Sequence, residues 1–195
     1  MSALDPRTNQ ITPVLDERGI SSVAVGAGAV WLSNGLTDEV WRLDPVTGQV
    51  VAKIPVGTTE DPSEPGAIAV GGDPVFVWVA SGLRPTVFRI DPSNNKGKAV
   101  PVNHVPTGIA AVAGSVWVTS QVGDTVTLLA PDGEVRGVFP VREDGCNGPT
   151  GIAVGADGVW VACSESGVVI RIDPDTRSVV ERLESGGSPD ALVAD

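Results

Sequence analysis

The chain has 195 residues, a net charge of −11, and a composition rich in Gly (24) and Pro (16). Its 13 Lys and Arg residues are scattered singly, which argues against the clustered basic surface that binds nucleic acid. No run approaches the ~18 consecutive apolar residues of a membrane-spanning helix, so no membrane insertion is expected.

The chain begins with MSALDPRTNQ, which has neither the basic nor the apolar region of a signal peptide. If Met1 is the native start, we expect a cytoplasmic protein. If the sequence is an excised domain, an extracytoplasmic location stays open.

A repeat organises the sequence. Residues 23–51 read VAVGAGAVWLSNGLTDEVWRLDPVTGQVV, and related stretches begin at residues 68, 109 and 152. The Trp of this motif recurs at intervals of 47, 39 and 43 residues, at Trp31, Trp78, Trp117 and Trp160. A period near 43 residues with several short strands per unit is typical of the blades of a β-propeller.

Each copy predicts four strands. A first strand ends in a Gly-containing turn, the second strand carries the Trp, and a polar loop leads to the third. A turn then leads to the fourth strand; it carries Asp-Pro at Asp5, Asp44, Asp91 and Asp173, and Ala130-Pro131 in the imperfect copy. We interpret the Asp-Pro pair as a turn-forming element of a hairpin rather than as a metal-binding site. The tryptophans are interpreted as packing between blades rather than as a ligand-stacking surface.

The two ends match parts of a repeat. Residues 2–14 match a third and a fourth strand, and residues 188–195 match a first strand. The prediction is a single all-β domain over residues 1–195, a β-propeller of four-stranded antiparallel blades in a ring that is incomplete or about five-bladed. It is either a fragment of a larger propeller or an array that closes by self-association, which would cover its open blade edges. The predicted units are a partial blade at 2–18, full blades at 19–65, 66–106, 107–149 and 150–188, and a partial blade at 189–195.

The copies resemble a known group of proteins. Residues 151–180, GIAVGADGVWVACSESGVVIRIDPDTRSVV, resemble the bacterial YVTN and NHL-type β-propeller repeats and the streptogramin (virginiamycin B) lyase-like proteins. The resemblance covers nearly the whole chain and implies the fold. The lyases use a His-centred site with bound Mg²⁺ and an acidic partner. This chain has one histidine, His104, so it cannot supply a pair, and no lyase residue is carried over.

In a propeller, the loops from strand two to three and from strand four to the next blade emerge on one face, which is the expected binding surface. Acidic loop residues there could hold Ca²⁺ or Mg²⁺ through oxygen ligands, but no compact calcium-binding spacing occurs, so solvated charge is preferred and no cofactor is predicted. One loop histidine gives no Ser-His-Asp arrangement, so no catalytic residue is assigned. The candidate ligand-binding residues are Asp38, Glu39, Arg84, His104, Asp124, Glu143, Asp144 and Glu165.

The sequence contains two cysteines, Cys146 and Cys163, which could form a disulfide. If the turn at residues 155–158 pairs two strands, Thr150 lies opposite Cys163, and Cys146 is four residues upstream of Thr150. A disulfide is then geometrically feasible and would indicate an oxidising compartment. Otherwise both are free thiols.

These observations favour a non-enzymatic module that recognises an unknown protein or small-molecule ligand through one loop face, as a sensor or scaffold part of a larger bacterial protein. The alternative is a fragment of a streptogramin-lyase-like, metal-dependent enzyme. A third interpretation is a purely structural array.

Overall fold

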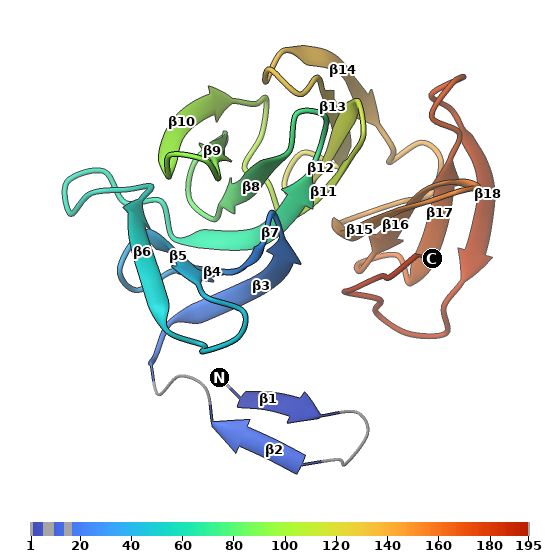
Figure 1. Ribbon diagram of the computed structural model, residues 1–195. Helices are drawn as coiled ribbons and strands as arrows, with labels where there is room; N and C mark the ends of the chain where they lie inside the picture. The colour runs from blue at the N-terminus through green and yellow to red at the C-terminus, as the bar shows by residue number, and fades with distance from the viewer. Residues whose placement is uncertain (1, 6–9, 14–16, 195) are drawn as a thin grey trace.

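The computed structural model describes residues 2–5, 10–13 and 17–194, which form strands and turns without a helix (Figure 1). An N-terminal hairpin, β1 (Ser2–Asp5) and β2 (Gln10–Pro13), is a two-stranded sheet of its own. Four sheets of four strands follow in chain order and are numbered first to fourth below. The described residues include no helix of the length and hydropathy that a membrane crossing requires.

Each sheet takes four consecutive strands. The first contains β3 (Ile20–Gly26), β4 (Ala29–Asn34), β5 (Glu39–Leu43) and β6 (Val50–Pro55). The second contains β7 (Pro65–Gly71), β8 (Phe76–Ser81), β9 (Thr86–Asp91) and β10 (Lys96–Pro101). The third contains β11 (Gly108–Val112), β12 (Ser115–Ser120), β13 (Thr125–Leu129) and β14 (Val135–Pro140). The fourth contains β15 (Pro149–Gly155), β16 (Gly158–Cys163), β17 (Val168–Ile172) and β18 (Val179–Glu184).

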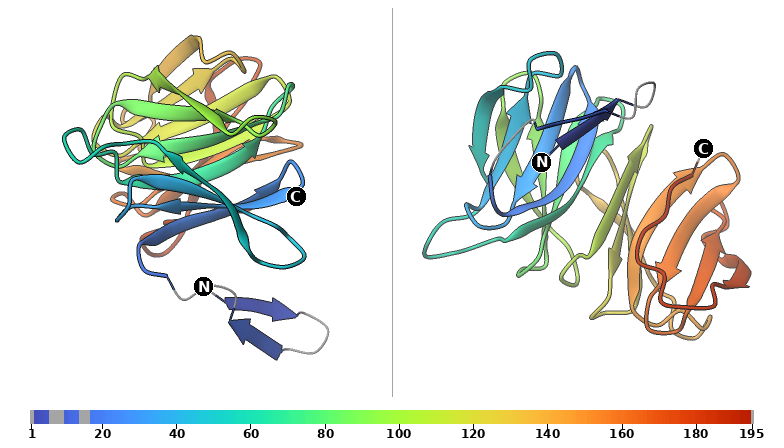
Figure 2. Two further views of the ribbon diagram at one scale, coloured as in Figure 1. Left: turned by 60° about the vertical axis from the view of Figure 1, so that its left-hand side comes forward. Right: turned by 90° about the horizontal axis from the view of Figure 1, so that it is seen from below.

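The sheets are antiparallel meanders whose strand order follows the chain, which confirms the predicted β-propeller architecture with four full blades. The first strands β3, β7, β11 and β15 pack on one another in sequence and form the inner side of an arc (Figure 2). The second and fourth sheets begin at Pro65 and Pro149, one residue before the predicted boundaries. Residues 189–194 follow the inner side of β15 without forming a strand, because no second strand pairs with them.

The recurring tryptophans lie between sheets. Trp31, Trp78 and Trp117 are 0%, 0% and 2% exposed, and each belongs to an apolar cluster shared with the next sheet along the chain. Trp160, at the matching position of the fourth sheet, is only half-buried. The degree of burial therefore depends on a following sheet, as expected for packing between blades.

The Asp-Pro turns lie at the opposite end of the sheets from the predicted binding loops. Asp44 Oδ1 accepts hydrogen bonds from the Val46 and Thr47 amides at 2.9 and 2.8 Å. Asp91 and Asp173 bind their own turns in the same way. For Asp44 and Asp173 the backbone N–H donors, and for Asp91 first the Ser93 hydroxyl, hold the carboxyl pKa below its ordinary value. These carboxylates therefore accept hydrogen bonds from residues of their own turns.

An arginine on the third strand joins one sheet to the next. Arg42 Nη1 donates to the Pro92 carbonyl at 2.8 Å and to Asn95 Oδ1 at 3.1 Å. Arg89 Nη1 donates to the Pro131 carbonyl at 2.9 Å. Both acceptors lie on the strand-three to strand-four turn of the following sheet, so this contact repeats from blade to blade.

The inner strands approach so closely that glycine is required at the contact. A Cβ at Gly108 would overlap the Thr150 carbonyl oxygen, and a Cβ at Gly71 would overlap the carbonyl oxygen of Ala111. At Gly97 on β10, by contrast, a Cβ would meet Ile90 at an ordinary 3.6 Å. Backbone contact at the inner side thus sets the spacing of the sheets.

We expect Gly108→Ala to lower the free energy of unfolding by about 1–3 kcal/mol, because the added methyl group must push β11 and β15 apart. Gly97→Ala is the matched control and should change it by no more than about 1 kcal/mol, with a stabilising sign favoured. Urea unfolding followed by Trp fluorescence measures both. Equal effects of the two substitutions would contradict the assigned inner contact.

Candidate functional site

The loop face, at one end of the sheets, consists of residues 35–38, 56–64, 82–85, 102–107, 121–124, 141–148, 164–167 and 185–188. In every sheet, the loop that leaves strand four donates a backbone hydrogen bond to the loop between strands two and three. The four bonds, each 2.9 Å, are Val56 N to Asp38 O, Val102 N to Pro85 O, Val141 N to Asp124 O and Ser185 N to Gly167 O. The loop face therefore consists of four pairs of loops, and a backbone hydrogen bond joins the two loops of each pair.

Asp38 and Asp124, both predicted ligand-binding residues, fasten these loops. Asp38 Oδ1 accepts from the Ser63 and Glu64 amides at 2.8 and 2.7 Å. Asp124 is 6% exposed, and its Oδ1 accepts from the Gly148 amide at 2.8 Å. Its other oxygen accepts from Arg142 Nε at 2.8 Å. These carboxylates already have partners within the protein.

Three other predicted residues also have neighbours on their own face. Glu39 Oε2 accepts from Trp41 Nε1 at 2.8 Å. Arg84 pairs with Asp61 of the preceding loop and lies 5.8 Å from the Phe88 ring centre. Glu165 Oε1 accepts from the Gln121 side chain of the neighbouring sheet at 3.3 Å. The contacts of Arg84 and Glu165 join loops of the loop face, whereas that of Glu39 lies within β5.

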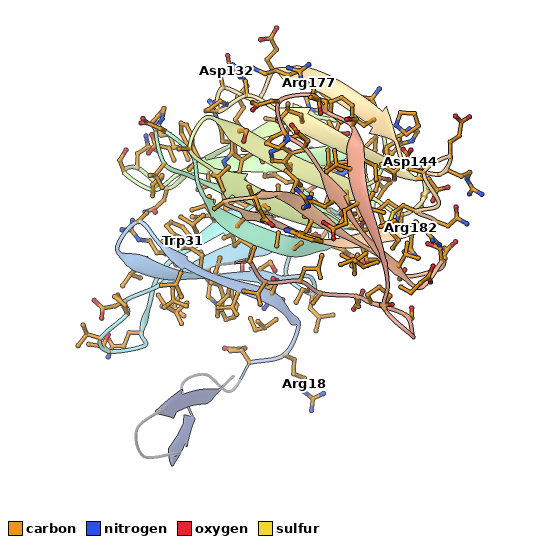
Figure 3. All side chains as sticks on the ribbon, turned by 90° about the vertical axis from the view of Figure 1, so that its right-hand side faces the viewer. Arg18, Trp31, Asp132, Asp144, Arg177 and Arg182 are labelled. Carbon is orange, nitrogen blue, oxygen red and sulfur yellow. A yellow bond between two sulfur atoms is a disulfide. The ribbon has the colours of Figure 1, made fainter. Side chains whose placement is uncertain are left out.

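His104, Glu143 and Asp144 are exposed. The His104 ring covers Gly123, where a Cβ would overlap the imidazole. Figure 3 shows Asp144 beside Arg182, whose Nε would lie 3.0 Å from a Cβ placed on the adjacent Gly145. Across residues 2–5, 10–13 and 17–194, no group of three or more His, Cys, Asp or Glu side chains could hold a metal ion. Asp124 and Glu165 both lie against Gly148, whereas Asp38, Glu39 and Arg84 belong to the first two sheets, so the eight predicted residues are distributed over all four sheets.

Cys146 and Cys163 form a disulfide with a Cα–Cα distance of 5.1 Å, and both are fully buried. It ties the loop 141–148 to the end of β16. The residue opposite Cys163 is Pro149 rather than the expected Thr150. A register shift between Pro149 and Ile152 causes the difference, because an irregular strand displaces the pairing by one residue.

A central depression of about 590 Å³ opens on the inner side of the arc. The same positions of successive repeats line it: the small or hydroxyl-bearing pair at the start of each first strand, followed by Ile in the second, third and fourth sheets. Sequence reasoning missed this site, although the aligned copies place such pairs at regular intervals. The lining residues are Ser21, Ser22, Gly66, Ala67, Ile68, Thr107, Gly108, Ile109, Gln121, Thr150, Gly151, Ile152, Asp190, Ala191 and Leu192.

Hydrogen bonds between sheets fix the rim of the depression. Ser33 Oγ donates to the Gly66 carbonyl at 2.6 Å, and Thr119 Oγ1 donates to the Thr150 carbonyl at 2.6 Å. Thr107 Oγ1 donates to the Pro149 carbonyl at 2.9 Å. Among the lining residues Asp190 alone is charged, and it is exposed. The wall therefore combines carbonyl and hydroxyl oxygens with Ile side chains.

Comparison with known proteins supports the fold. No protein-family model matches the sequence, and no curated protein matches it. Virginiamycin B lyase from Staphylococcus aureus superposes on all of this chain and on 67% of the lyase, with a TM-score of 0.82 and 17% identity. A functionally unknown protein from Desulfotomaculum acetoxidans superposes with a TM-score of 0.78 and 16% sequence identity. The match covers 97% of this chain and 64% of that protein. A streptogramin B lyase superposes with a TM-score of 0.60 and 14% sequence identity, and the match covers 92% of this chain and 74% of the lyase.

These structural similarities show that the protein has a β-propeller fold. The chain spans about two thirds of the length of the first two structures, and 50% of another similar chain, in Kuenenia stuttgartiensis hydrazine synthase. At 14–20% identity the similarity concerns the fold.

If Asp124 holds the two loops together, Asp124→Ala should lower the free energy of unfolding by about 1–3 kcal/mol, because the buried Gly148 amide loses its hydrogen-bond acceptor. Glu143→Ala, an exposed carboxylate on the next loop, is the control and should stay within about 0.5 kcal/mol. Chemical denaturation of both variants gives the comparison. An unchanged Asp124→Ala protein would refute the fastening role.

Removal of the disulfide should cost about 3 kcal/mol, because the 17-residue separation it closes gains entropy in the unfolded chain. Unfolding of the Cys146→Ser/Cys163→Ser protein, and of the native chain with and without dithiothreitol, measures this. Two reactive thiols in unreduced, folded protein would show that the bond is not formed.

Proposed function

We propose that the chain is a non-enzymatic binding module and that the central depression is its ligand site. The observation that carries the proposal is the construction of the depression from equivalent positions of all four sheets. A rigid scaffold that brings repeated polar positions to one concave surface is typical of small-molecule sites.

The lining residues favour a small ligand with hydrogen-bond donors. Hydroxyls of Ser21, Ser22 and Thr150 and the neighbouring carbonyls offer acceptors, while Ile68 and Ile109 offer apolar contact. Asp190 and the net charge of −11 favour a cationic ligand over an anionic one. A small alkylammonium group has these properties.

The enzymatic alternative rests on the fold shared with the virginiamycin B and streptogramin B lyases. Against it, the chain's single histidine, His104, lies on the loop face against Gly123 and is not among the residues that line the depression. The Cys146–Cys163 disulfide supports a place in an oxidising compartment for the binding module.

Chemical-shift mapping with n-butylammonium, n-butanol and butyrate tests the ligand class. We expect butylammonium to shift the amide resonances of Ser22, Gly108 and Gly151, with weaker shifts from butanol and none from butyrate. Ser21→Trp should fill the depression and abolish the shifts, while Thr59→Trp, on an exposed loop outside it, should leave them. Shifts confined to other regions, or equal shifts from butyrate, would contradict the proposal.

Incubation with virginiamycin B and Mg²⁺, followed by mass spectrometry, separates binding from catalysis. The proposed function predicts that the antibiotic is recovered unchanged. Its conversion to a product, at a rate proportional to protein concentration, would establish the lyase alternative.

A further inference from the structure

The interface between the second and third sheets departs from the repeat at the end of the sheets that carries the Asp-Pro turns. In the preceding interface, Arg42 donates to the Pro92 carbonyl and also to Asn95 Oδ1 of the next sheet. Arg89, in the same position of the second sheet, has one hydrogen bond to a described residue, the Pro131 carbonyl at 2.9 Å. Part of the Arg89 guanidinium therefore has no acceptor in the neighbouring sheet.

A change in the turn between strands three and four explains the difference. Asn95 is the residue with positive φ (+58°) in this turn of the second sheet, and Gly133 (+97°) is its counterpart in the third. The amide of each donates to the carbonyl of the residue that precedes the turn's proline. Because Gly133 has no side chain, it cannot offer Arg89 the second acceptor that Asn95 offers Arg42.

A depression of about 280 Å³ lies beside Arg89, between the second and third sheets. Phe76 forms one wall, and the Arg89 guanidinium carbon lies 4.4 Å from the centre of its ring. The prolines of the two adjoining turns, Pro74 and Pro131, add apolar surface, and Arg136 of β14 lines the depression from the third sheet. The depression thus combines an aromatic wall with two guanidinium groups.

The Phe76 wall comes from an enlarged turn. Four residues separate the first two strands of the second sheet, whereas two separate them in each of the other three. In those three sheets the recurring Trp donates its Nε1 hydrogen to an oxygen in or next to this turn. Trp78 is 0% exposed, its Nε1 has no acceptor among the described residues, and the Phe76 ring packs edge-on against it with ring centres 6.2 Å apart. The enlarged turn has therefore replaced a polar contact of the repeat by an aromatic one.

The two arginines carry charge that the protein itself does not neutralise. The four ion pairs of the described residues involve other arginines than Arg89 and Arg136. Asp132 is the one carboxylate in the lining, and its Oδ1 accepts from the Glu134 amide of its own turn at 2.9 Å. In a chain with a net charge of −11, two arginines without a carboxylate partner make this depression locally positive.

We propose that this depression binds a small carboxylate with a flat apolar body, such as an aromatic acid. The carboxylate lies between the Arg89 and Arg136 guanidinium groups, whose planar N–H donors match carboxylate oxygens in charge and geometry. The apolar body contacts Phe76 and the neighbouring prolines. The volume of about 280 Å³ is small for a ligand pocket and restricts the ligand to a small molecule.

The depression is distinct from the central one. The two share no lining residue, so the proposed aromatic-acid site goes beyond the proposed function and does not depend on it. It also lies between the two middle sheets, where a sheet follows and a sheet precedes.

Titration with benzoate, followed by amide and arginine Nε resonances, tests the proposal. We expect saturable shifts at Phe76, Asp132 and Arg136. Benzyl alcohol, which keeps the ring and lacks the charge, and acetate, which keeps the charge and lacks the ring, should both bind more weakly. The amides of Ser22 and Gly151 in the central depression should not shift with benzoate, so this result is independent of the ligand site under the proposed function.

Arg136→Gln should weaken benzoate binding at least about tenfold, because it removes a charged donor from an exposed position without removing a core contact. Arg18→Gln, at an exposed arginine outside the depression, removes the same charge and should change binding by less than about twofold. Circular dichroism establishes that both variants are folded. Absence of saturable shifts from benzoate, equal binding of benzyl alcohol, or equal weakening by the two substitutions would overturn the proposal.

Discussion

The structure depends on one repeated contact, the close approach of the inner strands of neighbouring sheets. At Gly108 and Gly71 the backbone of the next sheet occupies the space of a side chain, so the inner edges of the sheets lie almost in backbone contact. The sheets diverge outward from there, and the larger gap is filled by Trp31, Trp78 and Trp117. A narrow inner side and a wide outer side produce the curvature of the arc, and the curvature produces the central depression.

The loop face follows from the same regularity. Because each sheet begins and ends alike, the loop after strand four always meets the loop between strands two and three, and the two are tied by an amide-to-carbonyl bond. Asp38 and Asp124, with φ of +54° and +46°, add side-chain bonds to two of these ties. Carboxylates engaged in this way order the loops. We propose the inner rim, where Thr107 and Thr150 lie, as the ligand site in place of the loops.

The sequence predicted the fold well because its signals are local. The spacing of the tryptophans and the Asp-Pro turns set the four-strand repeat, and the burial of Trp31 and the Asp44 hydrogen bonds agree with the roles inferred for them. The site was harder to predict. The bonds of Asp38 and Asp124 end on backbone amides of loops that differ in length, and such partners leave no residue pattern. The register at Cys163 was misplaced by one residue because the shift after Pro149 has no sequence marker. The central depression carries no conspicuous chemical group, and it becomes visible only when equivalent positions are brought together in space.

The central claim is that every sheet is held by the faces of its neighbours, so that sheets covered on both faces differ from those covered on one. Hydrogen–deuterium exchange tests this most directly, since amide protection reports the free energy of local opening. The account predicts stronger protection in β8, β9, β12 and β13 of the two middle sheets than in the matching strands β16 and β17 of the fourth sheet, where Trp160 is only half-buried and Leu183 is 45% exposed. Equal protection in the second, third and fourth sheets, or stronger protection in the fourth, would contradict it.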